Sequence, residues 1–198
     1  MRRGKICAQM MILCLLLTAC SRSADKGAEE LALSIRAEYI AMTACAGQVE
    51  LTADYGERVY EYTLDFTYEK NGELVLTVVE PENIAGITAR VGENGTALEF
   101  DGTRLETGPL SGDGMSPVDS LPALLSYARE GCIAETGMEV MDGADTLRIC
   151  CRDPENEPGK GNEATLWFDG NTHDLVRGEL SVDGVTVIQC AFSTFSFQ

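Results

Sequence analysis

Basic residues are scarce in this sequence. It holds 15 lysine and arginine residues against 32 aspartate and glutamate residues, which gives a formal net charge of −17. Beyond the first five residues, the basic side chains form no cluster. An acidic surface of this kind repels phosphate groups, so the composition argues against nucleic acid as a partner. It also leaves no basic patch that could hold anionic lipid headgroups.

Motifs that mark common enzymes and metal sites are also missing. There is no G-x-S-x-G, no P-loop and no H-E-x-x-H. The single histidine, His173, follows a turn sequence, where we expect it at the surface. No C-x-x-C pair is available for zinc. We therefore expect no cofactor and no metal, and a hydrolase is the least supported class because no nucleophile–base pair is evident.

The N-terminal residues differ in pattern from the rest of the chain. Three basic residues precede an apolar run over residues 6–17, which is the layout of a secretory signal and is short for a membrane span. The run ends in Leu-Thr-Ala-Cys at Leu17–Cys20, which resembles a bacterial lipobox. The resemblance implies a diacylglyceryl thioether on Cys20 and cleavage before it, so that residues 1–19 are a signal peptide. The alternative is an ordinary secretory signal with a chance cysteine.

Cleavage at this point would leave a single acidic domain on a tether. Loss of three basic residues leaves 12 against 32 acidic ones, a formal charge of −20. Residues 20–27 are then a lipidated tether, and residues 28–198 are long enough for one domain with one core. Two acyl chains suffice for stable anchoring, so we expect the protein on the extracytoplasmic face of the cell membrane, held by its lipid.

An odd number of cysteines follows Cys20. One or two disulfides fit an extracytoplasmic protein, and burial as small apolar side chains fits equally well. The sequence does not decide between these alternatives or fix a pairing. The five cysteines are Cys45, Cys132, Cys150, Cys151 and Cys190.

Two helices are predicted from apolar residues at helical spacing. The first covers about residues 28–44 and has one apolar face. The second begins at a cap on Asp119 or Ser120 and ends at Gly131. Proline is tolerated in the first turn of a helix, which places Pro122 there.

Alternation of apolar and polar residues predicts the strands. The strongest signal covers residues 58–70, where aromatic and acidic or threonine side chains alternate. Asn-Gly and Asp-Gly pairs lie between many of the segments, as in short hairpins. The predicted strands cover residues 48–54, 58–70, 73–79, 84–91, 97–100, 103–107, 138–141, 146–152, 164–169, 174–182 and 185–197.

The order of elements determines the predicted fold class. A helix, a run of strands, a second helix and further strands, without β-α-β alternation, indicate an α+β fold. We expect one large curved antiparallel sheet, an unclosed half β-barrel, with both helices packed on its concave face. Two short helices cannot cover so many strands, so the concave face either packs on itself or keeps an apolar hollow.

With these elements in this order, the chain resembles the outer-membrane lipoprotein carrier and sorting family. The resemblance is carried by the lipobox, the N-terminal helix, the long meander, the segment Val78–Ile87 and a short strand pair around Asp101–Gly102. It implies helices that cover an open barrel, with a cavity that shields acyl chains. A similar architecture occurs in a clostridial spore-germination lipoprotein, which is implied to bind a cell-wall amidase. The arginine with which the carrier family locks its lid cannot be mapped onto this sequence, so no cargo residue is carried over.

Aromatic side chains are the remaining candidates for a binding site. Four of them share one face of the strand over residues 58–70, where they either form core or line a cavity for an acyl chain or partner. Trp167 is expected on the face opposite its neighbours, either exposed as a contact residue or covered at a rim by the C-terminal strand. The four on the strand are Tyr60, Tyr62, Phe66 and Tyr68.

Two functional hypotheses follow from these observations. The first is a non-enzymatic, membrane-anchored lipoprotein that binds a hydrophobic ligand, a lipid or a lipoprotein acyl chain, in a half-barrel cavity. The alternative is a protein-interaction lipoprotein that binds or stabilises a cell-envelope enzyme acting on peptidoglycan or in germination. Cys20 is the one residue to which the sequence assigns a definite role, as the site of lipidation.

Overall fold

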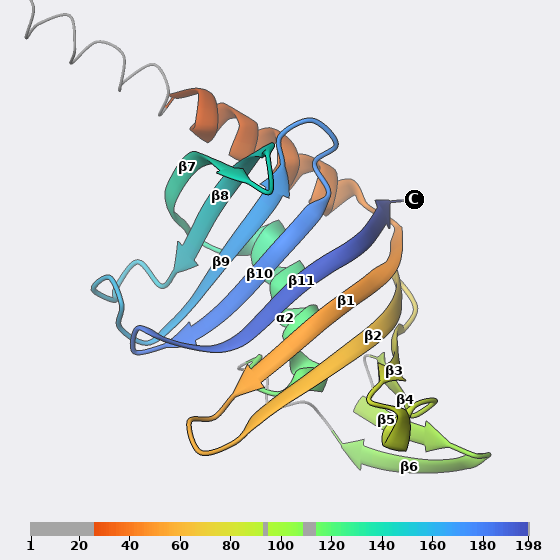
Figure 1. The fold of residues 1–198 in the computed structure, drawn as a ribbon. Helices are drawn as coiled ribbons and strands as arrows, with labels where there is room; N and C mark the ends of the chain where they lie inside the picture. The colour runs from red at the N-terminus through yellow and green to blue at the C-terminus, as the bar shows by residue number, and fades with distance from the viewer. Residues whose placement is uncertain (1–25, 93–94, 109–113, 198) are drawn as a thin grey trace, which may run out of the picture.

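A computed structural model describes residues 26–92, 95–108 and 114–197. Eleven strands form one antiparallel sheet in it, and two helices lie on the same side of that sheet (Figure 1), so the predicted fold class is confirmed. Residues 26–41 are helical and are called the N-terminal helix here. The other elements are β1 (Ala44–Asp54), β2 (Val59–Glu69), β3 (Leu74–Glu80), the 3-10 turn η1 (Glu82–Ile84), β4 (Thr88–Gly92), β5 (Gly95–Phe100), β6 (Thr103–Gly108), α2 (Pro117–Glu130), β7 (Ile133–Met141), β8 (Ala144–Arg152), β9 (Asn162–Asp169), β10 (Leu175–Val182) and β11 (Val185–Phe197).

Two meanders make up the sheet. The strand order is β6-β5-β4-β3-β2-β1-β11-β10-β9-β8-β7, so each meander contributes one half. The two halves meet where β1 pairs with β11 in antiparallel register. The sheet remains open, with β6 at one edge and β7 at the other. Figure 1 shows α2 crossing behind the middle strands and the N-terminal helix crossing the upper ends of β8 to β11.

The start of α2 differs from the prediction. Its cap is Ser116 rather than Asp119 or Ser120, because the Ser116 hydroxyl accepts a hydrogen bond from the Asp119 N–H at 3.2 Å. Pro117 is the first helical residue, a position that needs no N–H. Pro122 therefore lies inside the helix and not in its first turn, and the carbonyl of Val118 loses its helical partner there.

One predicted strand is wrong in its first half. The segment over residues 84–91 begins as a turn, since the Ile84 N–H bonds the Pro81 carbonyl at 3.1 Å and the Ala85 N–H bonds the Glu82 carbonyl at 3.3 Å. Backbone groups satisfied within a turn are not available to a neighbouring strand. Regular pairing with β3 starts only at Thr88. Other boundaries shift by a few residues, most of all those of β1 and β7, which begin earlier than predicted.

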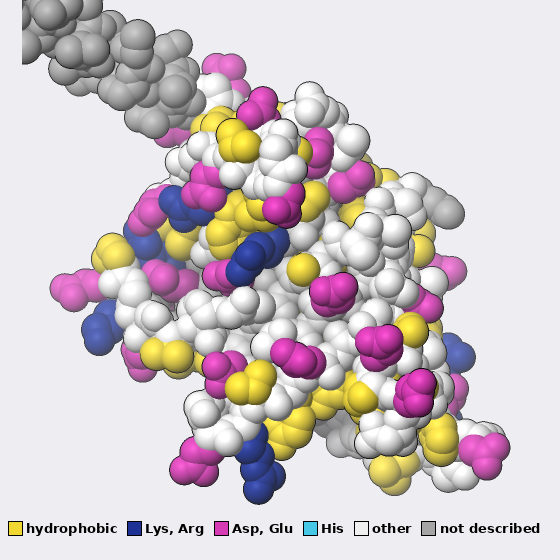
Figure 2. All heavy atoms as spheres, viewed as in Figure 1, with side chains coloured by type: hydrophobic (Ala, Val, Ile, Leu, Met, Phe, Trp, Pro, Cys, Tyr) yellow, Lys and Arg dark blue, Asp and Glu magenta, His cyan; other side chains and the backbone are white. Residues whose placement is uncertain are grey.

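A single core lies between the sheet and the helices. It contains buried side chains from both helices and from both halves of the sheet, joined in one contiguous cluster. The opposite face of the sheet is mixed, and Figure 2 shows acidic side chains spread across it, with basic ones in a few places and apolar ones between them.

Candidate ligand-binding face

Both helices present small or branched apolar residues to the concave face. The N-terminal helix buries Ala28, Ala32 and Ile35 along one stripe. The stripe of α2 is made of leucines, among them Leu124, which lies over Gly178 of β10. A side chain at Gly178 would overlap Leu124, with a Cβ only 2.7 Å from its Cδ1. This glycine is thus required for the close approach of α2 to the sheet.

An aromatic cluster fills the space below the N-terminal helix. The ring of Tyr39 packs edge-on against Phe168 at 5.2 Å and against Phe197 at 5.0 Å between centroids. Phe195 lies 6.1 Å from Tyr39 and 5.8 Å from Phe66. Burial raises the pKa of Tyr39 far above its usual range. Its hydroxyl reaches the His173 carbonyl at 3.3 Å, so this tyrosine is a neutral core residue.

A bulge in β11 brings its phenylalanines to the same side. The register with β1 shifts between Gln48 and Val49, which leaves Ser193 without an opposite residue. Strict alternation would place Phe192 and Phe195 on opposite faces of the sheet. The extra residue restores both to the concave face, where their rings lie 5.7 Å apart.

Two arginines connect the helix ends to each other. Arg36, on the N-terminal helix, donates to the carbonyl of Gly131 at 2.6 Å and to that of Ala128 at 3.4 Å, both at the C-terminal end of α2. Arg129, on α2, donates in return to the carbonyl of Tyr39 at 3.2 Å, near the end of the N-terminal helix. Helix C-termini carry free carbonyl groups and partial negative charge, so each arginine stabilises the other helix.

Arg129 also lies against the sheet. Its guanidinium sits 4.6 Å from the centre of the Tyr68 ring, a cation–π contact with β2. The Nη2 atom is buried and has no hydrogen-bond partner among the described residues. Burial raises the pKa of the nearby Cys45 thiol to about 12, although the positive charge of Arg129 acts in the opposite direction.

An apolar strip runs along the concave face from the core to the β6 edge. Directly paired residues of β2 to β6 form it, in the order Phe66, Leu76, Ala89, Leu98 and Leu105. The first three are buried, Leu98 is half-buried and Leu105 is 62% exposed. Cover by helices therefore stops partway along the strip and leaves its outer end open.

The predicted aromatic residues divide along this face. Phe66 is buried in the core and contacts Phe192 at 5.9 Å. Tyr62 and Tyr68 are partly buried and pack against the same cluster. Tyr60 is at the rim, where its ring lies 6.1 Å from that of Tyr55. The four aromatic residues of β2 are thus divided between the buried core and the exposed part of the concave face.

Trp167 lies on the outer face of the sheet, as its alternation predicted. It is only 9% exposed, and its cover differs from both alternatives considered above. The indole N–H donates to Glu139 at 3.0 Å, and the guanidinium of Arg177 lies 5.6 Å from the ring centre. Side chains of β7 and β10 therefore cover this tryptophan, rather than the C-terminal strand.

The cysteines form no disulfide among the described residues, and the histidine lies beside a carboxylate. All five cysteines in the described part of the chain are free thiols, and only Cys132 is exposed. His173 is half-buried rather than fully exposed, and its Nδ1 lies 2.9 Å from the Glu38 carboxylate. Cys20 lies outside the described residues.

Two surface hollows of the described residues lie beside α2 and beside β1 and β2. One of about 430 Å³ is lined by α2 and the segment before it, including Pro122 and Ser126. Another of about 500 Å³ has an acidic rim that includes Glu61 and Glu80. Within the described ranges, no group of three or more His, Cys, Asp or Glu side chains is placed to hold a metal ion. No helix of this part of the chain is long and apolar enough to cross a bilayer.

Together these features define an open antiparallel half-barrel whose apolar concave face is partly covered by two helices that cap each other. Comparison with protein-family models gives no match. Comparison with curated proteins gives none either.

Solved structures with a similar fold are found at low sequence identity. An uncharacterized conserved protein from Thermus thermophilus has a TM-score of 0.50 and 10% identity, over 87% of this chain and 88% of that chain. A LolA-superfamily protein from Nitrosomonas europaea has a TM-score of 0.40 and 13% identity, over 84% and 93%. A structure of the CwlD amidase from Clostridioides difficile in complex with the GerS lipoprotein has a TM-score of 0.40 and 16% identity, over 86% of this chain and 95% of the matched chain. A LolA-superfamily structure and one that contains the GerS lipoprotein are thus among the neighbours, and at these identities the similarity is one of fold.

Proposed function

We propose that this chain is a membrane-anchored binding lipoprotein without enzymatic activity. In this proposal residues 1–19 are removed, Cys20 carries the lipid, and residues 20–27 tether the domain to the extracytoplasmic face of the membrane. The ligand is apolar, a lipid or the acyl chain of another lipoprotein. The open end of the concave face is its binding site.

One observation carries the proposal, namely the apolar strip that continues beyond the helices. Leu105, at the outer end of the strip, is 62% exposed, and Phe100, two residues after Leu98 on the same face of β5, extends the strip and is 52% exposed. The other face of these strands is charged. An acyl chain laid along the strip would cover Leu105 and Phe100 and gain about 0.8 kcal/mol for each buried CH₂ group. The strip leads inward to the core residues held under α2, so a long chain that displaces the helices would meet further apolar surface.

Ligand binding can be tested with residues 21–198. Native mass spectrometry of this fragment, purified from a bacterial periplasm, should show bound lipid, and a fluorescent fatty acid should bind. Phe100→Asp should weaken fatty-acid binding at least tenfold, since it places a charge on the strip. Val140→Asp is the matched control, because Val140 is 72% exposed on β7 at the other edge of the sheet. A lipid-free mass, together with no fatty-acid binding, would rule out the proposed ligand.

Anchoring is tested separately at Cys20. Cells that express the full chain should incorporate labelled palmitate into it, and fractionation should recover it with membranes. Cys20→Ala should abolish the label and release the chain, because no other group carries the lipid in this proposal. Label that persists in the variant would show that the assignment of Cys20 is incorrect.

A second candidate function is suggested by the packed interior. The helices and the sheet already share one contiguous core, and Phe66, Phe168 and Tyr39 are fully buried within it. A protein partner, such as a cell-envelope enzyme, would need only the surface and no opening of the helices. Crosslinking in cells that recovers one envelope protein, with no lipid in the purified fragment, would favour this role.

A further inference from the structure

The strand β6 leaves an unpaired edge at one end of the described sheet. It is the terminal strand in the sheet order, and Figure 1 shows it as the outermost strand of its half. Five of its six residues, Thr103–Gly108, are exposed. Natural edge strands are commonly protected by charged side chains, especially lysine, by proline or by an inward-pointing charge. This edge has no lysine or proline, its two charged residues, Arg104 and Glu106, are of opposite sign, and it turns Leu105 to the concave face.

The hairpin between β5 and β6 determines which backbone groups are free. Asp101 and Gly102 both have positive φ, 47° and 75°, as in a two-residue type I′ turn. The residues that flank such a turn exchange hydrogen bonds, and bonded and non-bonded pairs alternate from there. Leu105 therefore bonds inward to β5, whereas the N–H and C=O groups of Arg104 and Glu106 point to the free edge.

The side chains of residues 103–107 are complementary to the same strand run in the opposite direction, with threonine at both ends, leucine at the centre and opposite charges on either side of it. We propose that β6 pairs with β6 of a second copy of this chain, antiparallel across a two-fold axis at Leu105. Arg104 then lies opposite Glu106 of the partner subunit, and Glu106 lies opposite the partner's Arg104. The two Leu105 side chains meet on the axis, and Thr103 faces the partner's Thr107. Opposite-charge and threonine pairs are favourable cross-strand neighbours.

Other registers are disfavoured by the same backbone and charges. Outward-pointing groups can bond only to outward-pointing groups, so the axis must pass through residue 104, 105 or 106. An axis at Arg104 would place two arginines opposite each other, and an axis at Glu106 would do the same with two glutamates. Like charges directly opposite are destabilising, so Leu105 is the position that satisfies both conditions.

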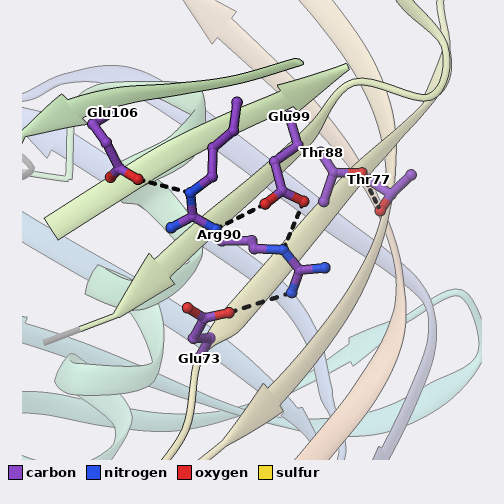
Figure 3. A network of polar contacts seen from close by, with 7 residues as sticks. Glu73, Thr77, Thr88, Arg90, Glu99 and Glu106 are labelled. Atoms are coloured by element: carbon purple, nitrogen blue, oxygen red, sulfur yellow. Dashed lines mark hydrogen bonds and ion pairs between the residues drawn. The ribbon is translucent and has the colours of Figure 1, made fainter. Parts of the chain in front are cut away.

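Within a single copy, Arg104 and Glu106 are already held in place by ion pairs. Arg104 donates from Nε to Glu106 at 2.7 Å and from Nη1 to Glu99 at 2.8 Å. Glu99 is bound in turn by Arg90, which also reaches Glu73 (Figure 3). Exposed ion pairs add little affinity, so backbone bonds and Leu105 supply most of it while the charges select the register.

A contact of one short strand per copy is small, so this dimer is weak in dilute solution. The membrane tether proposed above would raise the local concentration of the copies. In the dimer the apolar strip continues from Leu98 and Leu105 of one copy onto the partner's Leu105.

Cysteine crosslinking of the full chain in cells tests the register. In a Cys132→Ser background, which removes the exposed native thiol, Leu105→Cys should give a covalent dimer under mild oxidant. Directly opposite, non-hydrogen-bonded residues have Cα atoms about 4.5 Å apart, within the reach of a disulfide. Val140→Cys, at a residue on β7 that is at least as exposed as Leu105, is the control. The proposal is overturned if Leu105→Cys dimerises no more than Val140→Cys, or if it crosslinks to a different protein instead.

Charge reversal then tests the pairing itself. Added to Leu105→Cys, either Glu106→Arg or Arg104→Glu places like charges across the axis and should reduce the dimer at least fivefold. Co-expressed with different tags, the two variants complement each other and should restore the dimer only between unlike copies. Equal protease resistance of both variants and the parent shows that the fold is intact. A single variant that dimerises like the parent, or a mixture that restores nothing, would refute the two-fold pairing, whereas fatty-acid binding tests the ligand proposal independently.

Discussion

Among the five cysteines of the described part of the chain, burial separates one from the rest. Cys132 is exposed, whereas Cys45, Cys150, Cys151 and Cys190 are buried. Burial raises the pKa of Cys45 and Cys190 to about 12 and that of Cys151 to about 11. A buried thiol is less able to ionise and so less nucleophilic, which makes these side chains small core residues.

These shifts predict a loss of stability in alkali. The folded state holds the thiol protons more tightly than the unfolded state, where the thiol pKa is about 8.5. The free energy of unfolding should therefore be unaffected by these groups below about pH 8.5, and should fall as the pH rises from there toward 11. Urea unfolding at several pH values measures the slope. A Cys45→Ala, Cys151→Ala, Cys190→Ala variant should show a shallower slope, and an identical slope would contradict the assignment.

At the scale of elements, the two helices depend on each other through Arg36 and Arg129. Each guanidinium is bonded to carbonyls at the end of the other helix, and Lys70 adds a bond to the Ile40 carbonyl at 2.7 Å. Loss of one arginine leaves partly buried carbonyls without their donor. The helices would then separate more easily from the sheet.

Arg36→Ala and Arg129→Ala should each lower the free energy of unfolding by about 1–3 kcal/mol, the usual range for a buried charge-assisted hydrogen bond. The double variant should lose less than the sum of the two, since both arginines hold the same pair of helices. Chemical denaturation measures all three. Lys160→Ala, in an exposed loop, is the control and should change stability by less than about 0.5 kcal/mol. Strictly additive losses would show that the two caps act independently.

How far the sequence predicts these elements depends on how local their signals are. The alternation around Phe66 identified β2, and the turn dipeptides identified most hairpins, because these patterns lie within a few residues. The bulge at Ser193 has no such signal, so the common face of Phe192 and Phe195 could not be foreseen. The arginine caps join residues about 90 or more positions apart, and only the folded chain brings them together.

At the scale of the whole molecule, the two halves of the sheet depend on the pairing of β1 with β11. Gly47 lies in the middle of this junction, between Phe66 on β2 and Phe195 on β11. A Cβ at this position would overlap the Thr194 carbonyl and come within 3.0 Å of the Phe66 ring. The junction thus has no room for even a methyl group.

Gly47→Ala should therefore weaken both halves together. We expect a loss of about 3 kcal/mol, the upper range for overpacking, in a single cooperative transition, because one core spans both halves. Far-UV and near-UV circular dichroism during thermal unfolding should report the same lowered midpoint. Gly137→Ala in β7 is the matched control, since no atom lies within 4 Å of its added methyl group, and it should be neutral or slightly stabilising. Two separate transitions in Gly47→Ala would instead show that each half of the sheet holds its own fold.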